Sequence, residues 1–248
     1  MPGADQLERD DARRAAQERV RDRLAVLLAV TSGATDAIGF LALGGAFASV
    51  MTGNMVITGV GAATGDGSLI VLAVSAIVSF VVGCAVGARL AGLPQSGDPV
   101  WPAAVTRALA VQTALTVMLS IAWWVTGPER GETVRLILLG GHALALGLQS
   151  STVQRFGAGG LSTTYLTGTL TGLVVRLATG GGVRSVGRNA ALLLGLIGGA
   201  ALGAVLTAKA WALAPLTQLV PLVLVLALGM VLTTSSKRLE RITRQADH

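Results

Sequence analysis

Long apolar blocks alternate with short polar breaks along the chain. A block of ~20 residues can cross a ~30 Å hydrocarbon layer as a helix. Blocks of about this length occupy residues 24–46, 69–91, 107–126, 134–151, 189–208 and 213–234. Because a helix satisfies its backbone hydrogen bonds internally, it is the usual way for such a block to enter lipid. The pattern predicts an all-α membrane protein with six transmembrane helices.

Composition argues against a soluble domain. Charged residues make up 13% of the 248 positions, against about 25% in soluble domains, and the mean hydropathy is +0.68. The sequence pI is near 10.9, but the positive charges flank the apolar blocks and form no single basic face. We therefore expect the lipid bilayer as a partner and no nucleic acid. The single cysteine, Cys84, excludes an intramolecular disulfide.

Lysine and arginine mark the sidedness of the chain. Residues 1–23 form a charged N-terminal segment, and residues 237–248 form a basic tail. If the N-terminus is inside and six blocks cross, only Arg130, Arg135 and Lys209 fall outside. This distribution follows the positive-inside rule and predicts that both termini are cytoplasmic.

Two Thr-Gly segments, "MTGN" at 51–54 and "LTGT" at 166–169, stand apart from the long blocks. The stretch 49–64 would give a helix of about 24 Å, which is shorter than the hydrocarbon layer. We expect each segment to form a short re-entrant or half-crossing helix. Eight full crossings are the alternative, and the charge distribution separates the two topologies poorly.

The chain contains an internal repeat. Residues 44–65 and 159–180 align with eight identities in 22 positions. The repeat predicts two three-span units, residues 24–126 and 134–236, and an odd number of crossings inverts the second unit. Inverted repeats are common in transporters, where the substrate site lies near mid-membrane. Glycines at helix-packing spacing, which fit packing within the chain or a homo-oligomer face, are Gly83, Gly87, Gly195, Gly199 and Gly203.

Three stretches resemble a known family. They are "SGATDAIGFLALGGAFASVMTGNMV" at 32–56, "GLQSSTVQRF" at 147–156 and "TTYLTGTLT" at 163–171. Together they are similar to the YoaK-like family of bacterial multi-pass membrane proteins, over about residues 24–236. The resemblance implies a multi-spanning protein of the bacterial inner membrane. It implies no substrate, because the family has no established function.

Asp36 is the one acidic residue inside a predicted span. It lies about 20 Å along a helix from Arg23, at a depth where a charge is expensive. An acid at this depth suggests proton coupling or cation binding. The alternative is a protonated Asp36 that donates a hydrogen bond to a neighbouring helix.

His142 and Gln149 lie on one face of the fourth predicted span, and Gln112 lies in the third. His142 could relay protons or be a structural histidine. The Thr-Gly residues either line a site or allow close helix packing. The hypothesised central site, in which the two Thr-Gly segments meet, comprises Asp36, Thr52, Gly53, Asn54, Thr167, Gly168, Thr169, Gln149 and His142.

No enzyme motif is present. The chain has no H-E-x-x-H and no P-loop lysine, and two histidines with one cysteine make no metal cluster. We therefore expect no enzymatic activity and no cofactor. The leading hypothesis is a transporter or channel for a small solute or ion, with proton coupling through Asp36. The alternative is a non-transporting membrane scaffold that binds a partner or lipid through its N-terminal segment.

Overall fold

The structure is a computed structural model that describes residues 4–95, 98–155, 166–180 and 183–246. Six helices within these residues are long and apolar enough to span a membrane, which confirms the predicted all-α architecture. In chain order the helices are α1 (Ala4–Ala42), α2 (Met51–Thr64), α3 (Gly67–Ala91), α4 (Ala103–Thr126), α5 (Glu132–Gln154), α6 (Leu166–Ala178), α7 (Val183–Lys209), η1 (Trp211–Leu213) and α8 (Leu216–Ala246).

The two Thr-Gly segments form the short helices α2 and α6. These helices contain 14 and 13 residues, so each is about 20 Å long at 1.5 Å per residue. That length falls short of the ~30 Å hydrocarbon layer. Helix length therefore favours six crossings over eight in the part of the chain that the structure describes.

α1 is one continuous helix, so the charged N-terminal segment and the first span form a single rod. It ends at Ala42, before the end of the apolar block at residue 46. Gly44 and Gly45 have φ values of +113° and +92°, which residues with a Cβ rarely adopt. The glycine pair turns the chain out of the helix, and hydropathy alone does not detect this turn.

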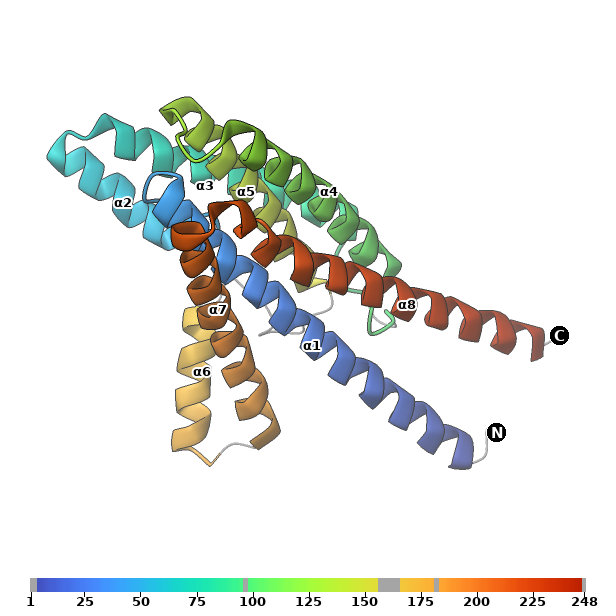
Figure 1. The fold of residues 1–248 in the computed structure, drawn as a ribbon. Coiled ribbons are helices and arrows are strands. Elements are labelled where there is room, and N and C mark those ends of the chain that lie inside the picture. Colours follow the sequence, from blue (N-terminus) through green and yellow to red (C-terminus); the bar gives the residue numbers. More distant parts are fainter. Residues whose placement is uncertain (1–3, 96–97, 156–165, 181–182, 247–248) are drawn as a thin grey trace.

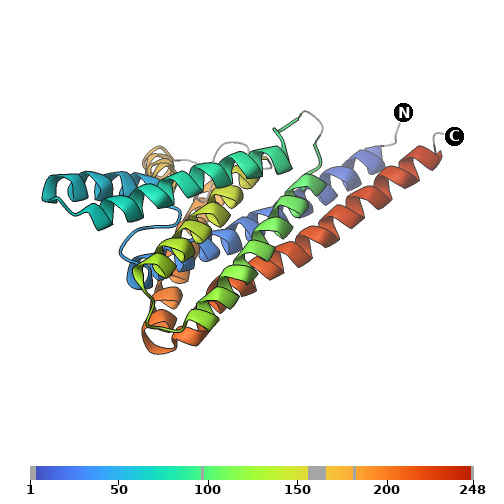
Figure 2. The ribbon, with the colours of Figure 1, turned by 90° about the horizontal axis from the view of Figure 1, so that it is seen from above.

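Four helices, α1, α4, α5 and α8, form the centre of the protein. α4 packs on α5 and α8, and α1 packs on α8. α3 lies along α5 and α7 lies along α1, while α2 and α6 form hairpins with α3 and α7 (Figure 1). The N- and C-termini lie at one end of the protein (Figures 1 and 2). We call this the terminal end and the opposite end, where α1 finishes, the far end.

Two large apolar clusters lie in this central group and where α3 and α7 pack on it. The terminal-end cluster contains Leu24, Leu28, Leu109, Leu192 and Leu222. The far-end cluster contains Ile38, Leu119, Trp123, Leu138 and Leu139. Along α1, α4 and α8, buried polar side chains lie between the two apolar clusters. α5 contributes further buried polar side chains. We call eight of these side chains the polar layer: Thr31, Ser32, Thr35, Gln112, Thr116, His142, Gln149 and Gln218.

The periphery is apolar and open. In the most apolar 18-residue stretch of α3, only 22% is buried inside the protein, and in that of α7 only 17%. Val78 and Val81 of α3, and Leu194 and Ile197 of α7, are each more than half exposed. Exposed apolar surface of this extent suits contact with lipid tails.

The glycines at helix-packing spacing lie at contacts between helices of the same chain. Gly83 and Gly87 lie where α3 meets α5, and Gly195, Gly199 and Gly203 lie where α7 meets α1. A Cβ added at any of these positions would press on atoms of the partner helix. The small residues thus allow the helix backbones to approach closely.

Candidate functional site

Asp36 anchors the loop that joins α1 to α2. Its Oδ1 accepts hydrogen bonds from the backbone N–H groups of Ala48 and Ser49, at 2.8 and 2.7 Å. Its Oδ2 accepts a hydrogen bond from the Ser49 hydroxyl at 2.5 Å. The side chain is buried and forms no ion pair with a described residue. All three of these bonds therefore hold one short segment of backbone.

These bonds bring the loop back alongside α1. Asp36 lies six residues before the end of α1, which corresponds to about 9 Å along the helix axis. Ser49 lies two residues before the start of α2, yet it lies at the level of Asp36. Gly39 makes room for the returning chain, because a Cβ there would lie 3.1 Å from the carbonyl oxygen of Ala46. α2 consequently starts part-way along α1.

Asn54 holds the same loop from the other side. Its Oδ1 accepts from the backbone N–H of Phe47 at 2.9 Å, and its Nδ2 donates to the Phe47 carbonyl oxygen at 2.7 Å. The Phe47 ring stacks on Phe40 with ring centroids 5.3 Å apart, and it lies against Gly53. Asp36, Phe40 and Asn54 all belong to the stretch 32–56 that carries the family resemblance. All three contact the loop between α1 and α2.

The remaining Thr-Gly residues are placed differently. Thr52 is exposed on α2, and Thr167 and Gly168 are exposed on α6, whereas Thr169 is buried. α2 packs on α3 and α6 packs on α7, and the two hairpins stand apart in Figure 1. The structure does not gather the two segments into one cluster. Residues 163–165, which precede the second segment, lie outside the described residues.

His142 and Gln149 belong to the polar layer, where Gln149 connects three helices. Gln112 Nε2 of α4 donates to Gln149 Oε1 of α5 at 2.7 Å. Gln149 Nε2 then donates to the Leu28 carbonyl oxygen and to Ser32 Oγ of α1, at 3.2 and 3.0 Å. Both glutamine side chains are fully buried. This chain of bonds joins α4, α5 and α1 between the apolar clusters.

Polar side chains line a narrow gap beside this chain of bonds. The space is too small for a water molecule, and its polar lining is Thr31, Thr35, Gln112, Thr116, His142 and Gln218. The Oε1 atom of Gln112 is buried without a hydrogen-bond partner. No hydrogen bond to a described residue is seen for the His142 imidazole. A buried polar atom without a partner is unusual and marks this gap as a candidate site.

Sequence reasoning missed Thr31, Thr35, Thr116 and Gln218 as members of the site. The available signal was a polar residue every four positions, as in Thr31 with Thr35 and Gln112 with Thr116. Such pairs share one face of a helix. Within the described residues, no group of three or more His, Cys, Asp or Glu side chains could hold a metal ion.

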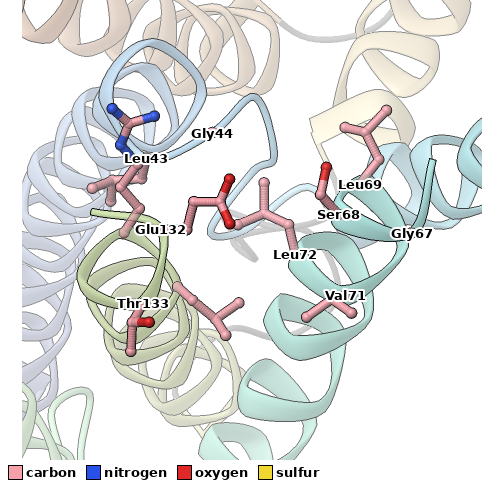
Figure 3. Close-up of a pocket in the computed structure, with 11 residues that line it drawn as sticks. Leu43, Gly44, Gly67, Ser68, Leu69, Val71, Leu72, Glu132 and Thr133 are labelled. Carbon is pink, nitrogen blue, oxygen red and sulfur yellow. The ribbon is translucent and has the colours of Figure 1, made fainter. Parts of the chain in front are cut away.

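A separate pocket of about 500 Å³ opens near the far end. It lies between the start of α3, the start of α5 and the loop after α1 (Figure 3). The Glu132 carboxylate extends from α5 towards Leu72, and Arg135 also lines the pocket. The polar layer and this pocket share no lining residue.

Arg130, Trp123 and Trp211 contact one another at the far end, and we call this group the clasp. The Arg130 guanidinium stacks over the Trp123 ring, 3.7 Å from its centroid, and donates to the Trp123 carbonyl oxygen at 2.9 Å. The Trp123 indole N–H donates to the Trp211 carbonyl oxygen at 2.9 Å. Burial, with a smaller contribution from the charge of Arg135, lowers the pKa of Arg130. These contacts join the α4–α5 connection to η1, which precedes α8.

Comparison with known proteins places the chain in a group without an assigned activity. The profile of a family described as a protein of unknown function (DUF1275) matches residues 24–231. The UPF0700 transmembrane protein YoaK of Bacillus subtilis (strain 168) is 31% identical over 155 residues. The aligned region covers 62% of this chain and 66% of that relative, just under two thirds of its length. No solved structure matches the chain.

Proposed function

Because the chain belongs to the DUF1275 family of membrane proteins, which has no assigned function, we propose a function from the chain's own residues. The proposed function is that of a transporter or channel for a small solute or ion. The proposed site is the gap in the polar layer. Under this proposal the protein resides in the bacterial inner membrane with both termini in the cytoplasm. The positive-inside distribution of lysine and arginine supports this orientation.

The unpaired Gln112 Oε1 is the observation that carries the proposal. It is completely buried at the centre of the helix group, and the gap beside it has no room for water. A polar group in the membrane interior is costly and typically marks a substrate or ion pathway. A polar ligand in the gap would supply the missing hydrogen-bond partner.

Matched contacts in the two halves support an inverted repeat. Gly83 packs against the backbone of Leu144, and Gly199 packs against the backbone of Val30. The two glycines are 116 residues apart, and their partners are 114 residues apart. The α3–α5 and α7–α1 pairs would then be equivalent contacts related by a two-fold axis in the membrane plane, as in many transporters.

A second contact repeats the same relation. Gly147 of α5 packs against the Phe80 carbonyl oxygen, and Gly33 of α1 packs against that of Leu196. These pairs are again related by offsets of 114 and 116 residues. Under the proposal, the polar layer lies near the repeat interface, where transporters with inverted repeats bind their substrates.

Asp36 has a positioning role under this proposal. An ionised carboxylate accepts hydrogen bonds better than a neutral one, and the three bonds to Ala48 and Ser49 all use its oxygens as acceptors. Proton uptake by Asp36 would weaken the loop anchor. Proton coupling would therefore act through the position of this loop and of α2.

Flux measurements with purified protein in liposomes test the proposal. Solid-supported membrane electrophysiology reports charged solutes, and stopped-flow light scattering reports neutral ones. We expect one class of solute to give flux above that of protein-free liposomes. Replacing Gln112 with leucine should reduce that flux at least tenfold, because the buried acceptor is removed.

Thr113→Val is the matched control. Thr113 follows Gln112 on α4, and its hydroxyl donates only to the Leu109 carbonyl oxygen of its own helix. The control should keep the wild-type flux. Absence of flux across the whole panel, or equal flux in the Gln112→Leu variant and the wild type, would contradict the proposal.

A scaffold role is the second candidate. α1 begins ten residues before its candidate span at Arg14, and α8 continues to Ala246, beyond its span end at Thr234. These extensions lie at the terminal end and offer a rigid docking element (Figure 1). Deletion of residues 2–12 should abolish partner or lipid binding if this role holds, while the Gln112→Leu variant should leave binding unchanged.

A further inference from the structure

The threonines that line the polar gap present oxygen lone pairs and no free hydroxyl protons. Each donates its hydroxyl proton to a carbonyl oxygen of its own helix, four residues earlier. Thr35 donates to Thr31 at 2.7 Å, and Thr116 donates to Gln112 at 2.9 Å. Thr31 donates to Leu27 at 3.2 Å. A hydroxyl that has committed its one proton can only accept from a ligand.

Gln112 also faces the gap as an acceptor, because its neighbours fix its orientation. A backbone carbonyl oxygen cannot donate, so the amide group of Gln149 must direct Nε2 to the Leu28 oxygen. Gln149 Oε1 therefore points to Gln112. Because this oxygen can only accept, Gln112 must donate to it from Nε2. Gln112 Oε1 is left buried and without a partner.

The other polar groups that line the gap are neutral or adaptable. Gln218 and a neutral His142 can each accept or donate. No aspartate, glutamate, lysine or arginine is among the lining residues that the structure describes. The gap therefore offers several neutral acceptors and no full negative charge.

We propose that the polar gap binds a small dehydrated monovalent cation, of the size of Na⁺, through Gln112 Oε1 and the hydroxyl oxygens of Thr35 and Thr116. This inference rests on the proposed function and names the ion that is transported or that drives transport. Neutral oxygens replace the hydration shell of monovalent cations in selective channels. Ca²⁺ and Mg²⁺ prefer sites that include carboxylates, and an anion requires donors. The absence of room for water also excludes a hydrated ion.

Thermal unfolding of purified protein in nanodiscs tests the inference. Choline chloride is replaced stepwise by NaCl at constant ionic strength, with LiCl and KCl as comparators. A ligand that binds the folded state raises the Tm in a saturable way. We expect NaCl to raise the Tm of the wild type, and sodium gluconate to produce the same rise, because the cation is the ligand.

Thr116→Val and Thr35→Val are isosteric variants that keep the helix packing while removing an acceptor. Each should weaken the apparent Na⁺ affinity at least tenfold, as should Gln112→Leu, whereas Thr113→Val should bind as the wild type does. No rise in Tm with Na⁺ beyond that with choline would overturn the inference. Equal Na⁺ affinity in wild type and both threonine variants would also overturn it.

Flux assays separate this inference from the proposed function. Sodium-dependent stabilisation that is lost in Thr116→Val supports the cation site even if no solute crosses the liposome membrane. Flux of a neutral solute that is indifferent to Na⁺, with no thermal shift, would overturn the cation site and leave the transport proposal standing.

Discussion

Ser49 gives Asp36 two hydrogen bonds, one from its backbone N–H to Oδ1 at 2.7 Å and one from its hydroxyl to Oδ2 at 2.5 Å. The two residues are 13 positions apart, and the loop between them doubles back along α1. This contact sets the depth at which α2 begins. The most unusual acid of the sequence is thus engaged by backbone and hydroxyl donors of the neighbouring loop.

Replacing Asp36 with alanine should destabilise the protein by about 2–4 kcal/mol, because several buried donors lose a shared acceptor. Asp36→Asn should cost less, since its amide oxygen can still accept from Ala48 and Ser49. Chemical denaturation in detergent measures both changes. If Asp36→Ala is as stable as the wild type, the carboxylate does not anchor the loop.

Asn54 should tolerate neither alanine nor aspartate. Its amide both donates to and accepts from the Phe47 backbone, and an aspartate cannot donate. We expect faster hydrogen exchange in the 43–50 loop of both variants, measured by mass spectrometry. Thr58→Val is the control, because the Thr58 hydroxyl bonds only within α2. Unchanged exchange in Asn54→Asp would mean that the donor half of the contact is dispensable.

Gly33 and Gly147 should respond alike to substitution by valine. Each lies against a backbone carbonyl of its partner helix, so a larger side chain forces the helices apart and costs about 1–3 kcal/mol or more. Gly198→Ala is the control, because no atom lies within 4 Å of the added Cβ. Thermal stability in detergent measures the effect. A large loss at only one of the two sites would weaken the equivalence of the halves.

The two hairpin tips should open to opposite sides of the membrane. Ala63 and Ala178 align in the internal repeat, and both are exposed. In a Cys84→Ser background, a membrane-impermeant maleimide should label Ala63→Cys from outside and Ala178→Cys only from the cytoplasmic side. Labelling of both positions from one side rules out the inverted repeat.

Arg130→Leu should destabilise the far end by about 2 kcal/mol or more. The change removes the stacking over Trp123 and the hydrogen bond to its carbonyl oxygen. Arg135→Leu is the control, because Arg135 is exposed, and losing its charge removes only a repulsion of Arg130 and no contact with Trp123. Thermal unfolding followed by Trp fluorescence reports the difference. Equal stability of the two variants would remove the clasp as a stabilising element.

Hydropathy was enough to predict the spans, because the membrane sets the length of an apolar helix directly. The end of α1 was missed, because the backbone conformation of Gly44 and Gly45 decides it. The return of the loop to Asp36 also escaped prediction, since hydrogen bonds across 12 and 13 residues leave no periodic trace.

The candidate site was predicted only in part. His142 and Gln149 were identified as polar residues in an apolar span, and both line or adjoin the gap. Gln218 was missed because its burial depends on the packing of α8 against α1 and α4, which a single sequence does not reveal. Thr31, Thr35 and Thr116 were missed because a threonine that bonds its own helix looks structural until its free lone pairs are located.

The apolar clusters on either side of the polar layer have a consequence for leakage. Water and ions must pass two separate hydrocarbon seals, and Leu24 and Leu28 belong to one while Ile38 and Leu119 belong to the other. A movement that parts only one seal wets the interior from one face of the membrane and leaves the other face dry. Under the proposed transport function, the chain would therefore admit a ligand without forming a continuous aqueous pore.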